Sequence, residues 1–199
     1  WMEAQARQHR TTAHPSSAAL QRAIQDLEAQ GAPPETVPPA VPPLEFLQPS
    51  DQAGVLGRFG SYPVLAVVAV GGMGIVLKAR DPALARIVAL KLLPPTLAAG
   101  SLARARFIRE ARAAAAVVHE HVVPIYAVDE AAGLPYLVMQ FVQGRTLAER
   151  IKATGALPLE EILRIGAQSA SGLAAAHAQG LIHRDVKPGN ILLENSIER

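Results

Sequence analysis

One segment near the end of the sequence, "HRDVKPGN" at positions 183–190, holds five polar side chains of complementary chemistry within eight positions. The carboxylate of Asp185 can accept a proton from a hydroxyl, and the amide oxygen of Asn190 can bind a hard cation. The ammonium of Lys187 can neutralise charge on a transferring phosphoryl group. The Pro-Gly pair between them predicts a turn that presents Asp185 and Asn190 side by side. A polar turn with caps does not explain this combination, so the segment indicates phosphoryl transfer.

A glycine-rich stretch, "VAVGGMGIVLKA", lies between two strand-like runs. Because they lack Cβ atoms, Gly71, Gly72 and Gly74 let backbone N–H groups approach a phosphate closely. The same pattern is also typical of an ordinary hairpin. The loop alone therefore leaves both interpretations open.

Lys91 lies in the apolar run "RIVALKLL", where an unpaired ammonium is costly and needs an anionic partner. Glu110, in the helical stretch that follows, is a candidate partner. The pair is either a structural salt bridge or a device that holds the lysine towards phosphate oxygens. The residues alone do not decide between these two roles.

The elements that must position these residues alternate between strand and helix patterns. Short β-branched runs separated by glycines and an Asp-Pro turn predict an antiparallel meander, and alanine-rich stretches predict helices. We expect strands at 62–70, 74–80, 86–93, 122–128 and 135–142, and helices at 101–116, 146–153 and 159–179. Ser101 is the expected cap of the first helix. In the long helix, Ile162, Ile165, Leu173 and Ala176 are expected to share one buried stripe. This order predicts an α+β protein in two layers or lobes.

Residues 1–56 differ from the rest of the chain. The stretch "SSAALQRAIQDLEAQG" predicts a short amphipathic helix, and three Pro-Pro pairs after it predict an extended linker. A docking peptide for a proline-recognition domain is the alternative, but a semi-rigid tether is favoured. We place the start of the globular domain at residue 57.

Composition excludes several classes of protein. The net charge is only +2 and the basic residues are interspersed with acidic ones, so we expect no nucleic-acid partner. There is no Cys, which excludes disulfides and thiolate metal sites and suits a cytoplasmic location. The longest apolar run, Val64 to Val70, is far shorter than the roughly 20 residues that span a bilayer. We therefore expect no membrane segment in this chain.

From about residue 57 to 199 the sequence resembles the bacterial, eukaryotic-like (Hanks-type) serine/threonine protein kinases. The resemblance is carried by the glycine loop, "VALK", the helix glutamate and "HRDVKPGN", in the order and at the separations usual in that family. It implies a protein-kinase-like α+β fold: an antiparallel five-stranded N-lobe sheet with one main helix, then the first helices and catalytic loop of a helical C-lobe. The sequence has no Met at position 1 and stops before an Asp-Phe-Gly segment, so we expect a fragment of a longer protein.

The resemblance also implies roles for individual residues. Asp185 is implied as the catalytic aspartate that orients a hydroxyl, Lys187 as a contact of the γ-phosphate, and Asn190 as a magnesium ligand. Lys91, paired with Glu110, is implied to bind the α- and β-phosphates of ATP. The residues implied to cover the nucleotide phosphates are Val68, Ala69, Gly71, Gly72, Met73 and Gly74. Those implied to line the adenine slot are Val76, Ala89, Met139 and Leu192, with Gln140 to Val142 as the hinge.

The implied activity is ATP- and Mg²⁺-dependent transfer of the γ-phosphate to Ser or Thr hydroxyls of protein substrates. The alternative is a non-catalytic, nucleotide-binding pseudokinase or scaffold module. The sequence departs from the family at Ala69, which stands where the loop has its first glycine. For this chain by itself we expect no activity, and the resemblance leaves open a downstream membrane anchor and dimerisation of the full-length protein. His119 and His121, in "HEH", are expected to pack a loop and not to bind a metal.

Overall fold

The structure is a computed structural model that describes residues 44–71 and 74–195, within a compact unit formed by residues 41–199. The predicted helix at 16–31, the Pro-Pro linker up to residue 43, and Gly72 and Met73 lie outside the described residues.

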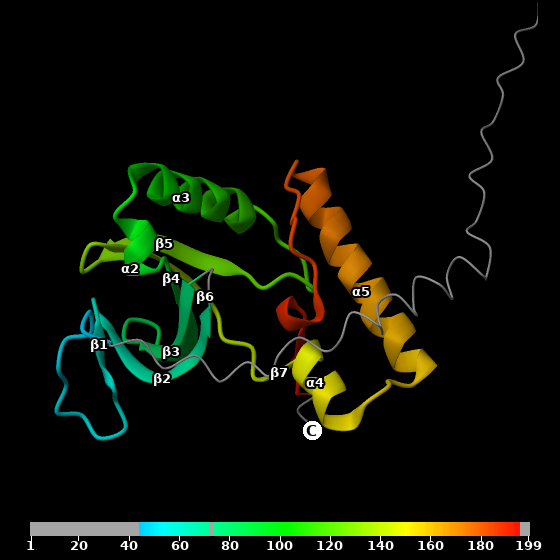
Figure 1. Cartoon of the computed structure of the whole chain (residues 1–199), viewed down its shortest axis with the longest axis horizontal. Coiled ribbons are helices and arrows are strands. Elements are labelled where there is room, and N and C mark those ends of the chain that lie inside the picture. The colour runs from blue at the N-terminus through cyan, green and yellow to red at the C-terminus, as the bar shows by residue number, and fades with distance from the viewer. Residues whose placement is uncertain (1–43, 72–73, 196–199) are drawn as a thin grey trace, which may run out of the picture. The chain divides into compact units, whose positions relative to one another are not determined.

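The centre of the described fold is an antiparallel sheet of six strands, where the sequence predicts five (Figure 1). Its spatial order is β1 (Gly57–Phe59), β2 (Tyr62–Gly71), β3 (Gly74–Asp81), β4 (Arg86–Leu92), β6 (Leu134–Gln140) and β5 (Ile125–Ala131). The unpredicted strand is β1, which pairs with the start of β2 through a turn at Gly60, whose φ is 57°. The pairing of β1 with β2 is stabilised by Phe59, which is fully buried in the core. A three-residue run is too short for sequence periodicity to reveal.

The three predicted helices are present with small shifts at their ends: α3 (Ser101–Ala115), α4 (Leu147–Thr154) and α5 (Leu159–Ala178). The short helix α2 (Pro95–Ala98) was not predicted, and the predicted Pro-Gly turn is the 3₁₀ turn η1 (Pro188–Asn190). The prediction that Ser101 caps α3 is wrong, because Gly100 is the N-cap and no side chain caps the helix. A second, two-stranded sheet pairs β7 (Gly144–Thr146) with β8 (Leu192–Glu194).

The register of β3, β4 and β6 gives the large sheet two chemically different faces. Residues paired directly across antiparallel strands point to the same face, and the face alternates along each strand. One face carries Leu77, Leu90 and Val138, which are almost completely buried in the main apolar core. Burying each such side chain stabilises the fold by about 1.5–3 kcal/mol. This core fixes which residues remain for the other face.

That other face collects residues implied to bind the nucleotide. Val76 pairs with Lys91, and Ala89 pairs with Met139, so these four side chains share one side of the sheet. Lys78, which pairs with Ala89, joins the same face. A shift of one residue in any of these pairings would exchange this set with the core residues.

The packed part of the chain includes residues that precede β1. The ring of Phe46 packs edge-on against Phe59, with ring centroids 5.8 Å apart, and Gln48 forms an isolated bridge with Arg58. Phe46 and Leu47 both pack against the main core. Residues before the predicted domain start at 57 therefore contribute to the same folded unit.

The long helix α5 buries only part of its predicted stripe. Ile165 and Ala176 are buried and Leu173 is half-buried, but Ile162 is 49% exposed, so the prediction is wrong for Ile162. The cause is the place at which α5 contacts the rest of the fold. That place is Gly172, which lies against the backbone of His121. Ile162 lies nearly three turns before that point. Among the residues described, no helix is both long and apolar enough to cross a membrane.

Gly74 provides a first test of this fold. Its φ is 135°, and a Cβ at this position would lie 2.3 Å from the carbonyl oxygen of Leu92 on β4. We predict that Gly74→Ala lowers the free energy of unfolding by about 2 kcal/mol, because overlap and backbone strain act together. Urea unfolding measures the change. The matched control is Gly71→Ala on β2, which pairs with Gly74 across the hairpin and where nothing lies within 4 Å of the added methyl group. Equal stabilities of the two variants would contradict the close approach of β3 and β4.

Candidate active site

The loop between α5 and β8 holds the carboxylate of Asp185 between an amide and an ammonium. Asn190 donates from Nδ2 to Oδ2 of Asp185 at 2.7 Å and to its backbone oxygen at 2.8 Å. The Nζ of Lys187 lies 3.0 Å from the same Oδ2. The turn η1 makes this possible by placing Asn190 within reach, with its N–H donating to the Lys187 carbonyl. The prediction that Asp185 and Asn190 lie side by side is confirmed.

The electrostatics of this cluster keep Asp185 ionised. The hydrogen bond from Lys187 is the largest influence that lowers the pKa of the Asp185 carboxyl, and the bond from Asn190 is second. Both partners engage Oδ2, so Oδ1 accepts no hydrogen bond from the described residues. In the same way, Asn190 uses its Nδ2 on Asp185 and keeps Oδ1 for another partner. Each of the two side chains thus keeps one oxygen that accepts no hydrogen bond from the described residues.

The backbone before Asp185 is strained in a way that the sequence did not indicate. Arg184 has a φ of 62°, in the left-handed region that non-glycine residues rarely adopt. The Asp185 N–H reaches back to Nδ1 of His183 at 3.3 Å. Such strain is held only where surrounding contacts enforce it, and it is concentrated at functional sites. No residue type in the segment signals it, since Arg does not favour this conformation.

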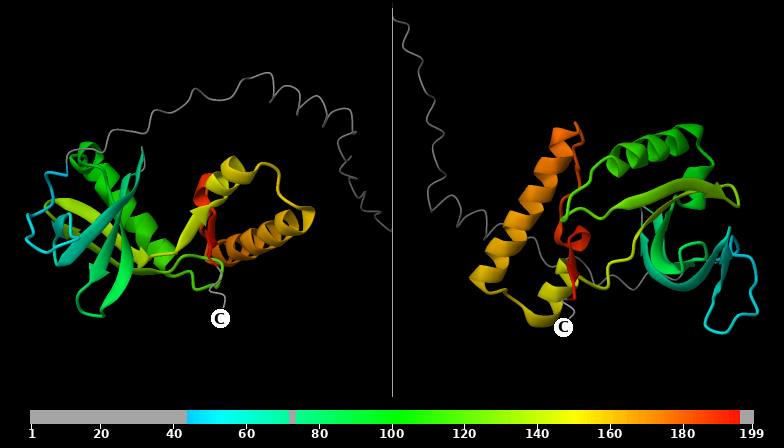
Figure 2. Two further views of the ribbon diagram at one scale, coloured as in Figure 1. Left: turned by 90° about the horizontal axis from the view of Figure 1, so that it is seen from below. Right: turned by 180° about the vertical axis from the view of Figure 1, so that it is seen from behind.

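The β7–β8 ribbon fixes the far end of the loop and was also not predicted. The N–H of Leu147 donates to the carbonyl of Ile191 at 2.8 Å, joining the start of α4 to the loop. A capping box between Thr146 and Glu149 fixes that helix start. Gly144 is required because a Cβ there would meet the Leu193 carbonyl. Figures 1 and 2 show the loop and ribbon lying between α5 and the large sheet.

The expected ion pair between Lys91 and Glu110 is not formed. Lys91 is half-buried on β4 and pairs with no carboxylate of the described residues, while Glu110 is exposed on α3. Glu110 lies at an exposed position, where water can solvate its carboxylate and no cation partner is needed. The ion pair that α3 does form is a different one: Arg104 donates to the Gly133 carbonyl at 2.8 Å and pairs with Glu130 at the β5–β6 turn.

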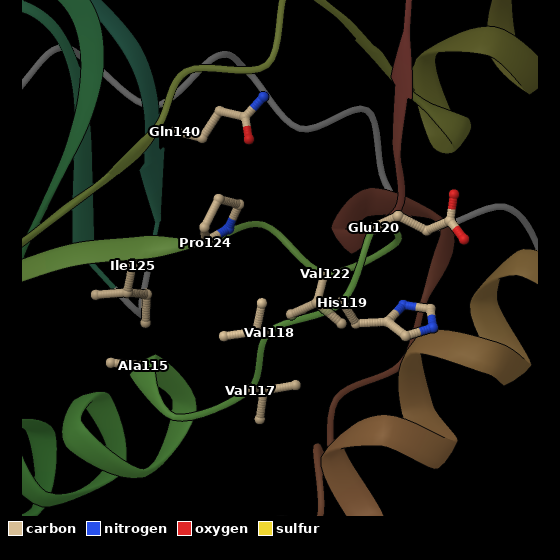
Figure 3. Close-up of a pocket in the computed structure, with 9 residues that line it drawn as sticks. All are labelled: Ala115, Val117, Val118, His119, Glu120, Val122, Pro124, Ile125 and Gln140. Atoms are coloured by element: carbon tan, nitrogen blue, oxygen red, sulfur yellow. The ribbon is translucent and has the colours of Figure 1, made fainter.

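The residues implied to form the hinge, Gln140 to Val142, differ in which of their groups the fold already engages. Gln140 pairs with Val88, so its side chain leaves the sheet on the face opposite to Met139. There it lines a cavity of about 530 Å³ together with Val118 and Pro124 (Figure 3). Its N–H donates to the Pro124 carbonyl at 3.1 Å. Val142, two residues on, makes no backbone hydrogen bond within the described part of the chain.

The remaining residues implied to bind the nucleotide lie on the open edges of the two sheets. Val68 is 52% exposed and Ala69 and Gly71 are exposed at the end of β2. Leu192 is 46% exposed on β8, where it pairs with Thr146. None of these side chains is needed to fill the core.

The two histidines of "HEH" join the α3–β5 loop to α5. Nε2 of His119 lies 3.1 Å from the hydroxyl of Ser171, and its Nδ1 accepts from the backbone N–H of His121. The two rings contact edge to face. This is the packing role expected for them. In the described ranges, His, Asp and Glu form no group of three or more that could hold a metal.

The described residues thus combine a two-faced antiparallel sheet, with Lys91 on the face opposite the core, and a loop that groups Asp185, Lys187 and Asn190. Comparison with known proteins specifies the family. Residues 62–198 match the protein kinase domain family. The chain is 43% identical over 136 residues to the serine/threonine-protein kinase PknE of Mycobacterium tuberculosis, covering 68% of this chain and 24% of that protein. It is 41% identical over 136 residues to PrkC of Bacillus subtilis, covering 68% of this chain and 21% of that protein.

The fold is similar to solved kinase domains as well. The crystal structure of the PknI kinase domain of Mycobacterium tuberculosis superposes with a TM-score of 0.63 at 33% identity, covering 73% of this chain and 58% of that one. The chain belongs to the protein kinase family. It spans about a quarter or less of the length of the curated relatives named above. The family match begins at Tyr62, so the unpredicted strand β1 lies before the matched region.

The cluster around Asp185 gives a prediction on pH. Because Lys187 contributes most to the lowered pKa of Asp185, we predict that Lys187→Met raises that pKa towards its ordinary value. A carboxylate with a depressed pKa stabilises the folded state above its unfolded pKa, and that contribution is lost as the pH falls through the folded pKa. The variant should therefore lose this acid-sensitive contribution. NMR titration of the Asp185 carboxyl carbon measures the shift, with Lys152→Met on α4 as the control. An unchanged Asp185 titration in Lys187→Met would show that the 3.0 Å contact is not formed in solution.

Proposed function

We propose that the protein containing this chain is an ATP-dependent serine/threonine protein kinase, and that this chain forms its N-lobe and catalytic loop. The observation that carries the proposal is the carboxylate of Asp185, held through Oδ2 by Lys187 and Asn190 with Oδ1 left to accept. A carboxylate in this arrangement can orient a substrate hydroxyl and accept its proton. The Lys-Pro pair after Asp185 favours Ser and Thr over Tyr as the acceptor.

The donor set at the loop fits a magnesium ion. Mg²⁺ prefers oxygen ligands, and Asn190 presents its amide oxygen because its nitrogen is already bonded to Asp185. When bound, the ion neutralises charge on the phosphates of ATP. In this proposal Asn190 holds the metal, while Lys187 is positioned to approach the γ-phosphate. Protein kinases as a class take ATP with Mg²⁺, and the oxygen groups of this loop suit that pair.

The open face of the large sheet is the proposed site of the nucleotide. Val76, Ala89 and Met139 offer an apolar surface for the adenine ring, and Val142 offers a backbone N–H and carbonyl to its edge. Lys91, on the same face, is the proposed contact of the α- and β-phosphates. Its ammonium has no carboxylate partner in the described residues, which leaves it available to an anion.

A non-catalytic pseudokinase is the second candidate, and one observation favours it. The Lys91–Glu110 pair, implied to fix the lysine for phosphate contact, is not formed. Both candidates require nucleotide binding on the same face of the sheet. They differ in whether Asp185 takes part in transfer, so the two are separated by a variant of that residue.

The test is phosphate transfer by the protein with its complete kinase domain. We predict that Asp185→Asn lowers the rate of autophosphorylation by at least about 100-fold, a loss typical of removing a positioned acid–base group. ATP binding should remain, since the change leaves the sheet face intact. Asp51→Asn, at an exposed position before β1, is the matched control. A wild-type protein that binds ATP but transfers no phosphate would establish the pseudokinase instead. Equal rates in wild type and Asp185→Asn would remove Asp185 from the mechanism.

A further inference from the structure

A second lysine lies on the nucleotide face, at the end nearest the hinge. Lys78 on β3 pairs with Ala89, which in turn pairs with Met139, so the three residues form one row across the sheet. Lys91 is in the neighbouring row with Val76. The face therefore carries two ammonium groups in adjacent rows.

The cation of Lys78 is held by an aromatic ring and not by an acid. Its Nζ lies 4.7 Å from the centroid of the Phe141 ring, and it pairs with no carboxylate of the described residues. Both side chains are half-buried. A cation over the face of a ring within about 6 Å of its centroid is attracted by the ring quadrupole, and partial burial strengthens the attraction.

The position of Phe141 makes this contact relevant to the hinge. Phe141 is the first residue after β6 and directly precedes Val142. The sheet hydrogen bonds end at Gln140, and the Gln140 N–H is already bonded to Pro124. Beyond that point, the Phe141 ring joins the hinge to β3 through its contact with the ammonium of Lys78.

We propose that Lys78 is a positioning residue that fixes the hinge through Phe141 and so sets the affinity for the adenine base. The identity of the ligand, ATP, rests on the proposed function. The contact between Lys78 and Phe141, in contrast, is present in the protein without nucleotide. Lys78 acts through Phe141 and touches neither the phosphates nor the reacting atoms. Holding Phe141 against β3 orders Val142 before the nucleotide arrives, which reduces the entropy lost on binding.

The experiment compares Lys78→Met, which keeps the length of the stem, with Lys78→Arg, which keeps the cation over the ring. The protein with its complete kinase domain is examined by hydrogen exchange of the hinge amides at residues 141–143 and by the affinity for ATP with Mg²⁺. We expect Lys78→Met to speed hinge exchange and weaken ATP binding by about two- to fivefold, while Lys78→Arg resembles the wild type. Phe141→Leu should have the same effect as Lys78→Met, and the double variant should be no weaker than either single variant.

Three results would overturn the proposal. The first is hinge exchange that is unchanged in Lys78→Met. The second, when the wild type binds ATP, is faster hinge exchange in Lys78→Met with unaltered ATP affinity. Equal losses in Lys78→Met and Lys78→Arg would also contradict it, because a cation over the ring would then be irrelevant. ATP binding by the wild-type protein distinguishes a failure of the proposed function from a failure of this inference. Suppose that the wild type binds no ATP, while hinge exchange still responds to Lys78→Met but not to Lys78→Arg. That result would support the role of the Lys78–Phe141 contact in fixing the hinge and would contradict the proposed nucleotide site.

Discussion

The strand register of β3, β4 and β6 is the constraint on which the site depends. Leu77, Leu90 and Val138 must face the core, and they are almost completely buried there. Since side chains alternate along a strand, that requirement alone sends the neighbouring Val76, Lys91 and Met139 to the opposite face. The apolar core and the proposed nucleotide face are thus two consequences of one set of backbone pairings. Gly74 matters for the same reason, because it lets the start of β3, next to the β2–β3 turn, approach Leu92 of β4.

The loop at residues 183–190 obeys a different kind of constraint, which is local and polar. Asp185, Lys187 and Asn190 are exposed or half-buried, so the core does not hold them. Their hydrogen bonds, the η1 turn and the β7–β8 ribbon hold them instead. The left-handed backbone at Arg184 is the strain that this arrangement maintains. Residues 141–143 link β6 of the large sheet to β7, and within them the Phe141 ring lies against the ammonium of Lys78 on β3.

The sequence predicted those features that depend on pattern or on dense local chemistry. Short β-branched runs between turns located β2, β3, β4, β6 and, with its ends shifted, β5, and the polar segment at 183–190 predicted the contact between Asp185 and Asn190. It did not predict β1, because three residues carry no periodicity and burial of Phe59 depends on tertiary pairing. It also predicted a Lys91–Glu110 pair, which is not formed, because local patterns place Lys91 on a strand and Glu110 on a helix without specifying how the two elements pack. Ile162 was assigned to a buried stripe because helical periodicity predicts a face without specifying how much of it is covered.

On the proposal above, the nucleotide binds on the sheet face that carries Lys91. A crystal structure of the protein with its complete kinase domain, bound to a non-hydrolysable ATP analogue, tests this placement. We predict the adenine ring between Val76 and Ala89 on one side and Leu192 on the other, with the phosphates at Lys91. An analogue bound behind the hinge, in the cavity beside Gln140 and Val118, would contradict it.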